Sequence, residues 1–189
     1  MSAKGKGGGA RRNRHADLSA TVPLYHEVHL LELVDRLDCP LILILDCVQD
    51  PRNLGACLRT AEAAGVDAVV VPRRKSAPIS DTVRKIACGA AERLPIMQIT
   101  NLARTLEDLK REGIQVMGTD HNATENLYRA DLTGPLALVL GGEGKGMRRL
   151  TRESCDSVMR IPMAGTEACL NVSVAAGVCL FEALRQRRI

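Results

Sequence analysis

Ile161-Pro-Met-Ala-Gly-Thr-Glu-Ala-Cys-Leu-Asn-Val-Ser-Val-Ala-Ala-Gly177 is the stretch of this chain that says most about its fold. It begins as the end of a strand, passes through a loop of small residues, and becomes a helix that is apolar on almost every side. Asn171 stands at the turn into that helix, where an Asn side chain caps free backbone N–H groups. A helix this apolar over residues 172–184 must be buried on most sides, in a core or against a second copy. The stretch therefore predicts a ligand site at the mouth of a buried helix.

Short runs of Val, Ile and Leu alternate with helical segments along the rest of the chain. Strands are predicted at Leu41–Asp46, Asp67–Val71, Ile96–Ile99, Gln115–Gly118, Leu136–Leu140 and Ser157–Ile161. Helices are predicted at Leu24–Leu37, Asn53–Ala64, Asp81–Arg93, Leu102–Glu112 and Asn171–Arg187. Continuously apolar strands separated by helices predict an α/β fold, an open and mostly parallel sheet with helices on both faces.

Composition limits the classes of function. The chain has 189 residues, a formal net charge of +4 and 46% hydrophobic residues, which suit one globular domain with a mild preference for polyanions. It has no Trp, and its aromatic residues are Tyr25, Tyr128 and Phe181. Because single-strand readers stack bases on aromatic side chains, an RRM, cold-shock or OB-type module is disfavoured.

The seven cysteines do not suggest a disulfide framework. Their number is odd, no two are spaced as CxxC, and Cys57, Cys88 and Cys179 lie in apolar runs. Buried thiols in a reducing cytoplasm, without a metal site, fit this pattern better. The sequence shows no signal peptide and no apolar run of transmembrane length, so we expect a cytoplasmic protein with no membrane partner.

The chain divides into three regions. Residues 1–22 are rich in Gly, Lys and Arg and are predicted to be a disordered tail, either a solvated segment or an arm that attracts phosphates. Residues 23–40 form a linker with a leading helix. Residues 41–189 form the α/β domain.

Two further motifs accompany the opening stretch. Leu138-Val-Leu-Gly-Gly-Glu-Gly-Lys-Gly-Met147 is a buried-type strand that runs into four glycines around one carboxylate. It is not a Walker A loop, since no Ser or Thr follows the Lys, and it is not a GxGxxG fingerprint. Its glycines predict a backbone that approaches a ligand closely. Asp50-Pro-Arg-Asn-Leu-Gly-Ala-Cys-Leu-Arg59 predicts a helix that Asn53 begins, with Gly55 leaving room beside Arg59.

Together the three motifs resemble those of the SpoU (TrmH) family of RNA ribose 2'-O-methyltransferases, over about Leu41 to Arg187. Within that family the chain is most similar to bacterial enzymes that methylate a guanosine of large-subunit (23S) ribosomal RNA. The resemblance implies S-adenosylmethionine as cofactor, a ribose 2'-hydroxyl as methyl acceptor, and a C-terminal trefoil knot of the SPOUT type. The nearly all-apolar last helix, which one small domain can hardly cover, further predicts a homodimer formed through the knot region and that helix.

The resemblance also implies roles for individual residues. It assigns catalysis to Asn53, Arg59, Glu143 and Asn171, and cofactor binding to Thr119, Gly141, Ile161 and Leu170. Apart from the resemblance, the residues Lys145, Arg148 and Ser173 are candidates for contact with RNA; the alternatives are a solvated charge cluster for the two cations and helix capping for Ser173. The family role of Arg59 is to activate the hydroxyl. A guanidinium stays protonated, however, so holding a phosphate and stabilising a developing alkoxide is the physically easier role.

The chain departs from the family pattern in two respects. Cys169 stands where many members carry Ser, and a thiol is the weaker hydrogen-bonding group. The most similar relatives also carry an N-terminal RNA-binding domain, which is expected to be absent here. Two alternatives therefore stay open: a transfer RNA ribose as acceptor, or an RNA-binding ribosome-assembly factor without turnover.

Overall fold

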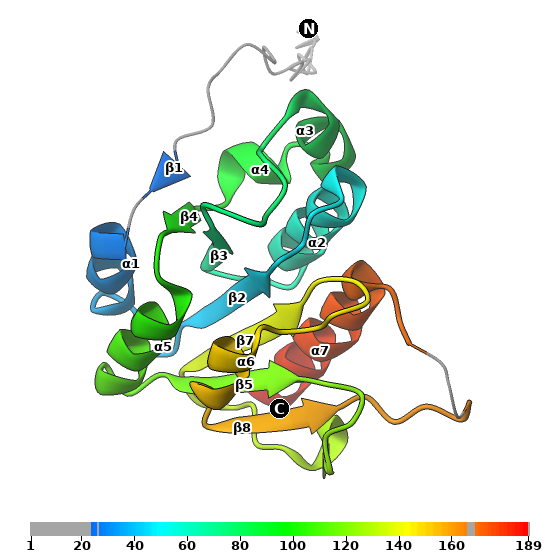
Figure 1. The fold of residues 1–189 in the computed structure, drawn as a ribbon. Helices are drawn as coiled ribbons and strands as arrows, with labels where there is room; N and C mark the ends of the chain where they lie inside the picture. The colour runs from blue at the N-terminus through cyan, green and yellow to red at the C-terminus, as the bar shows by residue number, and fades with distance from the viewer. Residues whose placement is uncertain (1–23, 26, 166–168, 189) are drawn as a thin grey trace, which may run out of the picture.

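The computed structural model describes residues 24–25, 27–165 and 169–188. The predicted tail at residues 1–22 lies outside this range. The described residues form an eight-stranded sheet in the order β1-β4-β3-β2-β7-β5-β8-β6, and each pair of neighbouring strands is parallel (Figure 1). The strands are β1 (Leu24–Tyr25), β2 (Leu41–Asp46), β3 (Ala68–Pro72), β4 (Ile96–Ile99), β5 (Gln115–Thr119), β6 (Glu125–Asn126), β7 (Leu136–Gly141) and β8 (Ser157–Arg160).

Helices cover both faces of this sheet. They are α1 (Glu27–Val34), α2 (Pro51–Ala63), α3 (Asp81–Ala87), α4 (Ala90–Arg93), α5 (Leu102–Arg111), α6 (Arg149–Glu153) and α7 (Val172–Arg187), with a 3-10 turn at Leu127–Arg129. Alternate residues of β2 point to opposite faces. Leu43 packs in a core with α2, α3 and α7, and Ile44 packs in a second core with α1 and α5 (Figure 1). The predicted α/β fold with helices on both faces is confirmed.

The central strands β2 and β7 mark the point where the chain changes direction across the sheet. They pair in register from Leu41↔Leu136 to Asp46↔Gly141. The chain leaves β2 toward β3 on one side and leaves β7 toward β8 on the other. Because the two connections diverge, the carboxyl ends of β2 and β7 lie at the point of the strand order where open parallel sheets bind ligands.

Several predicted boundaries were wrong. The helix predicted at Asp81–Arg93 is two helices, because Cys88 (φ 53°) and Gly89 (φ 87°) adopt left-handed backbone conformations between them. The helix predicted from Leu24 begins at Glu27, after the short strand β1. The trefoil knot remains a prediction.

The thiols are more varied than predicted. All seven cysteines are free; Cys57 and Cys179 are buried as expected, whereas Cys88 is exposed at the end of α3. Burial raises the pKa of the thiols of Cys57 and Cys179 to about 12, so neither is a thiolate nucleophile at neutral pH. None of the described helices is long and apolar enough to span a membrane.

Candidate active site

A chain of hydrogen bonds joins three distant parts of the sequence beyond the carboxyl ends of β2 and β7. The Asn53 side-chain amide of α2 donates to the Glu143 carboxylate in the loop after β7. The Asn171 amide donates to Asn53 Oδ1 over 3.0 Å, and the Ser173 hydroxyl donates to Asn171 Oδ1 over 2.7 Å. Since an ionised carboxylate only accepts, the chain has one direction, and both amides are fixed in orientation. Three of the four predicted catalytic residues therefore meet, with Ser173 beside them.

Two of these residues were expected to cap helices. Asn171 does so, because its Oδ1 accepts from the Ser173 backbone N–H over 2.9 Å. For Asn53 the expectation was wrong. The cap of α2 is Asp50, which accepts from the Arg52 N–H over 2.8 Å, and Pro51 follows it at the first helical position. The Asn53 side chain is thereby left for Glu143 and Asn171.

Arg59 lies apart from this chain. It is exposed on α2, does not line the cavity described below, and pairs with none of the residues that the structure describes. Gly55 does not leave room for it as predicted. A Cβ at Gly55 would lie 2.8 Å from the Val83 carbonyl oxygen, so the absence of a side chain lets α2 pack closely against α3.

A cavity of about 410 Å³ lies beside the polar chain, beyond the carboxyl ends of β5, β7 and β8. All four residues predicted to bind cofactor, Thr119, Gly141, Ile161 and Leu170, line it. Further lining residues that the sequence did not single out are Asp120, His121, Asn122, Leu140 and Met163. A cavity of this size with a largely aliphatic wall suits a ligand the size of a nucleoside derivative.

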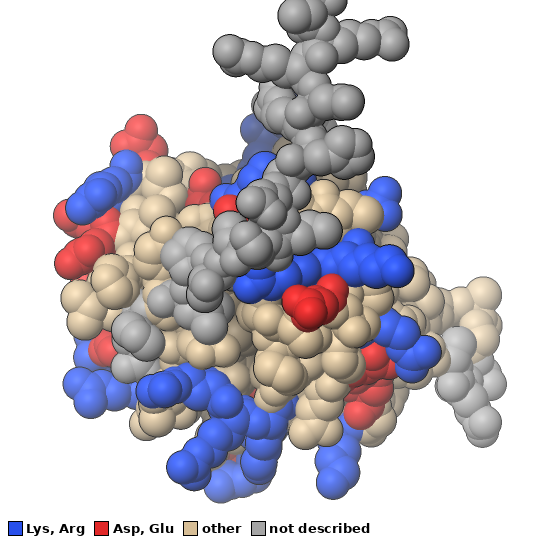
Figure 2. Space-filling model, turned by 90° about the horizontal axis from the view of Figure 1, so that it is seen from above, with Lys and Arg blue, Asp and Glu red and all other residues tan. Residues whose placement is uncertain are grey.

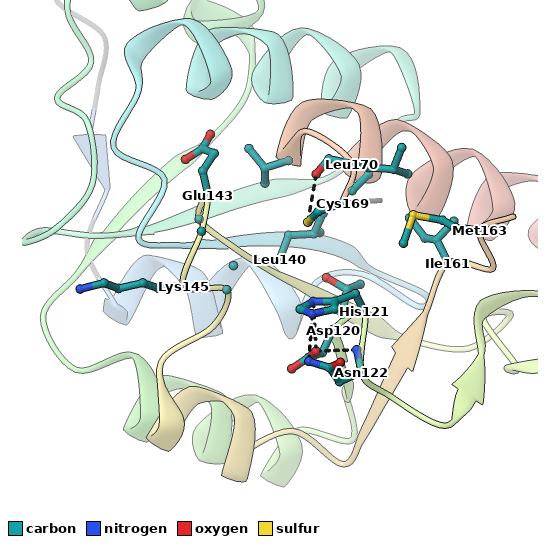
Figure 3. A pocket seen from close by; sticks show the side chains of 17 residues that line it. Asp120, His121, Asn122, Leu140, Glu143, Lys145, Ile161, Met163, Cys169 and Leu170 are labelled. Carbon is teal, nitrogen blue, oxygen red and sulfur yellow. Dashed lines mark hydrogen bonds and ion pairs between the residues drawn. The ribbon is translucent and has the colours of Figure 1, made fainter. Parts of the chain in front are cut away.

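The walls of the cavity differ in polarity. Figure 3 shows Ile161, Met163 and Leu170 on one side and Asp120, His121 and Asn122 on another. In the same view Lys145 extends away from the cavity, and Glu143 turns toward α2. Cys169 lines the cavity as well, and its thiol makes only a long contact of 3.8 Å to the Leu170 carbonyl oxygen. The position expected to hold a Ser hydroxyl therefore offers weak hydrogen bonding.

The glycine loop packs against protein backbone more closely than predicted. A Cβ at Gly141 would lie 2.1 Å from the Met147 nitrogen, and a Cβ at Gly142 would lie 2.1 Å from the Cys47 carbonyl oxygen. No side chain fits at either position. These two glycines are needed for the loop to fold back on itself and to contact the end of β2, whatever ligand it binds.

Asp46, at the end of β2, is a residue that the sequence analysis missed. Its carboxylate is fully buried and accepts from the Arg148 backbone N–H over 2.8 Å and from the Arg148 Nε over 2.7 Å. Its carbonyl oxygen accepts from the Gly142 N–H over 2.7 Å. Asp46 thus holds both ends of the loop 142–148. A lone carboxylate at the end of an otherwise apolar strand was the signal available in the sequence.

The Asp46–Arg148 pair gives Arg148 a structural role that the sequence analysis did not predict. Its guanidinium, predicted to contact RNA, forms an ion pair with Asp46 over 2.7 Å and is 37% exposed. Contact with RNA remains a prediction for Lys145 and Ser173, which have no comparable buried partner.

The parallel sheet and the cavity define an α/β protein with room for a nucleoside-sized ligand beyond the carboxyl ends of β5, β7 and β8. The chain belongs to the SpoU rRNA Methylase family, whose family model matches residues 40–181.

Individual relatives support this assignment. The chain is 59% identical over 167 residues to the 23S rRNA (guanosine-2'-O-)-methyltransferase RlmB of Pseudomonas putida, covering 88% of this chain and 67% of that protein. It is 61% identical over 165 residues to the RlmB of Pseudomonas aeruginosa, covering 87% of this chain and 66% of that protein. The chain thus spans about two thirds of the length of these curated relatives.

Its fold is similar to the crystal structure of the SpoU methyltransferase AviRb from Streptomyces viridochromogenes in complex with AdoMet. The TM-score is 0.76 at 27% identity, covering 84% of this chain and 64% of that one.

Proposed function

We propose that this protein transfers the methyl group of S-adenosylmethionine to the ribose 2'-hydroxyl of a guanosine in 23S ribosomal RNA, in the cytoplasm. The observation that carries the proposal is the hydrogen-bonded chain Glu143–Asn53–Asn171, which borders a cavity lined by all four expected cofactor positions. The identity of 59–61% to two RlmB proteins supports the choice of acceptor.

The cavity suits the cofactor. Its aliphatic residues, such as Leu140, Ile161 and Leu170, offer surfaces on which an adenine can lie without an aromatic partner. S-adenosylmethionine supplies a methyl group already activated on a sulfonium. Methyl transfer would form a carbon–oxygen bond and break the carbon–sulfur bond, with the thioether S-adenosylhomocysteine as leaving group and the 2'-hydroxyl proton passing to solvent water. The protein therefore has to align the hydroxyl and stabilise the charge that develops on its oxygen.

The described side chains divide these tasks. The hydrogen bonds within the polar chain hold the Asn53 and Asn171 amides in fixed positions at the cavity edge, where they suit orientation of a ribose. We assign to Arg59 the neutralisation of a substrate phosphate and of the developing alkoxide, because its guanidinium is exposed and has no described partner. Proton removal by a literal arginine base is not required.

We further propose that the protein works as a homodimer through α7. Val174 and Phe181 lie two helical turns apart on this helix and are 50% and 49% exposed. Leu170, just before the helix, is 36% exposed. Large apolar side chains exposed on one side of a helix whose other side is buried suit contact with a second copy.

Nucleoside mass spectrometry tests the proposed function. The protein is incubated with S-adenosylmethionine and unmodified 23S ribosomal RNA, and in parallel with transfer RNA. We expect 2'-O-methylguanosine in the ribosomal RNA alone. Methylation of transfer RNA alone would establish the alternative acceptor. No product, together with no cofactor binding in calorimetry, would favour an assembly factor without turnover.

A further inference from the structure

Three consecutive cations follow β3 without compensating carboxylates. Arg73, Arg74 and Lys75 are all exposed, and their side chains form no ion pair with any residue in the described ranges. Other exposed arginines are paired, among them Arg52 with Asp50, Arg93 with Glu62 and Arg149 with Glu153. Unpaired like charges on adjacent residues create a local positive potential, which attracts a polyanion. On the face that Figure 2 displays, Lys and Arg side chains gather along one edge with few carboxylates among them.

These cations lie at the same edge of the sheet as the candidate active site. The Arg73 N–H donates to the Ile99 carbonyl oxygen over 2.8 Å, and the Ala77 N–H donates to the Val48 carbonyl oxygen over 2.9 Å. The second bond ties their segment to the loop after β2. Cys47, which precedes Val48 in that loop, lies so close to Gly142 that a Cβ on Gly142 would clash with the Cys47 carbonyl oxygen. The basic segment, the loop after β2 and the glycine loop are therefore successive neighbours.

The electrostatics of Cys47 agree with this placement. Its thiol has a raised pKa, chiefly because of burial and secondly because of the Asp46 carboxylate. The positive charges of Arg148 and Lys75 oppose that rise. Lys75 is therefore close enough to act on a residue that touches the glycine loop.

The backbone at Lys75 is an unfavourable one for a lysine. Its φ is 66°, in the left-handed region that glycine adopts more easily. Such conformations at non-glycine residues often accompany functional sites. A lysine at this position suggests that its side chain is used.

We propose that Arg73, Arg74 and Lys75 form a phosphate-binding rim that holds the backbone of the substrate RNA beside the active site. The inference rests on the proposed function for the identity of the polyanion. RNA fits better than an acidic protein, because protein interfaces need an apolar core. None of the large exposed apolar side chains in the described residues belongs to this segment; they are Val28, Tyr128, Leu150, Leu170, Val174 and Phe181. Phosphate contacts need only charge.

Binding of a fluorescently labelled RNA hairpin, followed by anisotropy at several KCl concentrations, tests the rim. Arg73→Ala/Arg74→Ala removes two of its charges. Lys75→Gly removes the third and relieves the backbone. The control is Arg36→Ala/Arg111→Ala, which removes two exposed charges that precede β2 and β5 and so lie at the opposite edge of the sheet; Arg111, unlike the rim residues, is paired with Asp108. Each lost phosphate contact should weaken binding about five- to tenfold near 0.1 M salt and lower the salt slope by about 0.7 to 0.9.

The expected result is a loss of RNA affinity and of salt slope in the rim variants, with the control close to wild type and cofactor affinity unchanged in calorimetry. Equal losses in the control, or an unchanged slope in the rim variants, would overturn the rim. Displacement of the hairpin from the wild type by polyglutamate as readily as by polyadenylate would point instead to an acidic protein partner, and would also overturn it.

The rim and the proposed function fail in different ways. If Arg73→Ala/Arg74→Ala loses RNA affinity but the wild type transfers no methyl group, the rim is supported and the proposed methyltransferase function is overturned. Methyl transfer by Arg73→Ala/Arg74→Ala with an unchanged KM for RNA would support the enzyme and overturn the rim.

Discussion

Arg59 is the predicted catalytic residue that lies outside the Glu143–Asn53–Asn171 chain, and this separation can be tested. Arg59→Ala should slow methyl transfer by at least about 100-fold if the guanidinium stabilises the developing charge. It should leave cofactor affinity within about twofold of the wild type. Arg59 does not line the cavity, and residues that share no contacts affect each other's energetics little. Arg52→Ala on the same helix, whose side chain is 78% exposed, is the control and should keep its rate. An unchanged rate in Arg59→Ala would remove the role assigned to it.

Asp46 allows a second prediction about a single side chain. Asp46→Asn keeps the shape of the residue but removes the charge that Arg148 binds, so we expect a loss of about 2 to 4 kcal/mol in the free energy of unfolding. Cofactor affinity should fall too, because the loop 142–148 loses its anchor. Urea denaturation and calorimetry measure the two effects.

The control for Asp46→Asn is Asp50→Asn. It breaks the exposed ion pair with Arg52 but leaves a residue equally able to cap α2, so the free energy of unfolding should stay close to that of the wild type. Equal stability losses in both variants would contradict a special role for the buried pair.

At the scale of residues, the sequence predicted which residues belong to the site better than it predicted their hydrogen-bond partners. Asn53, Glu143 and Asn171 stand out because three motifs carry them, yet nothing local shows that Asn53 donates to one and accepts from the other. Those bonds span 90 and 118 residues along the chain. Asp46 escaped notice because its partner lies 102 residues away, and a buried charge is recognised only when its partner is known.

At the scale of elements, two helix-interior glycines have opposite expected effects. Gly55→Ala puts a Cβ 2.8 Å from the Val83 carbonyl oxygen and 2.9 Å from the Ile86 Cβ, so α2 and α3 must separate. We expect a loss of about 1 to 3 kcal/mol. Gly177→Ala on α7 meets its nearest neighbour, Thr60 Cγ2, at 3.7 Å, so higher helix propensity should add about 0.5 to 1 kcal/mol. Chemical denaturation of both variants measures the contrast, and a stabilised Gly55→Ala would show that the helices adapt.

Strands were predicted better than helices for a physical reason. The predictions for β2 and β4 agree with the structure at both ends, since a strand buried on both faces is apolar at nearly every position. Helix ends depend on capping and backbone angles. Asp50 rather than Asn53 starts α2, and the left-handed Cys88 divides one predicted helix into α3 and α4. The short α6 has too few residues to show a helical period.

At the scale of the whole molecule, the topology explains why distant motifs form one site. Each motif follows a different strand, and parallel strands bring their carboxyl ends to one edge of the sheet. Because β2 and β7 are neighbours although more than 80 residues of chain lie between them, the loops after them meet at this edge. The pattern of apolar runs predicted the parallel sheet, but strand order is a global property that no local pattern contains.

The proposed homodimer is the prediction that concerns the whole molecule. Val174 and Phe181 are already half buried, so burying the rest of each side chain in the dimer contributes about 0.8 to 1.5 kcal/mol per subunit, half the value for complete burial. Light scattering should give twice the chain mass of 20.4 kDa for the wild type. Phe181→Glu should give the monomer mass, because an unpaired carboxylate cannot be buried in an apolar contact. The control is Leu150→Glu on α6, a side chain that is 58% exposed and away from α7, which should remain dimeric. A wild type of 20.4 kDa would contradict the dimer, and dissociation in both variants would place the contact elsewhere than α7.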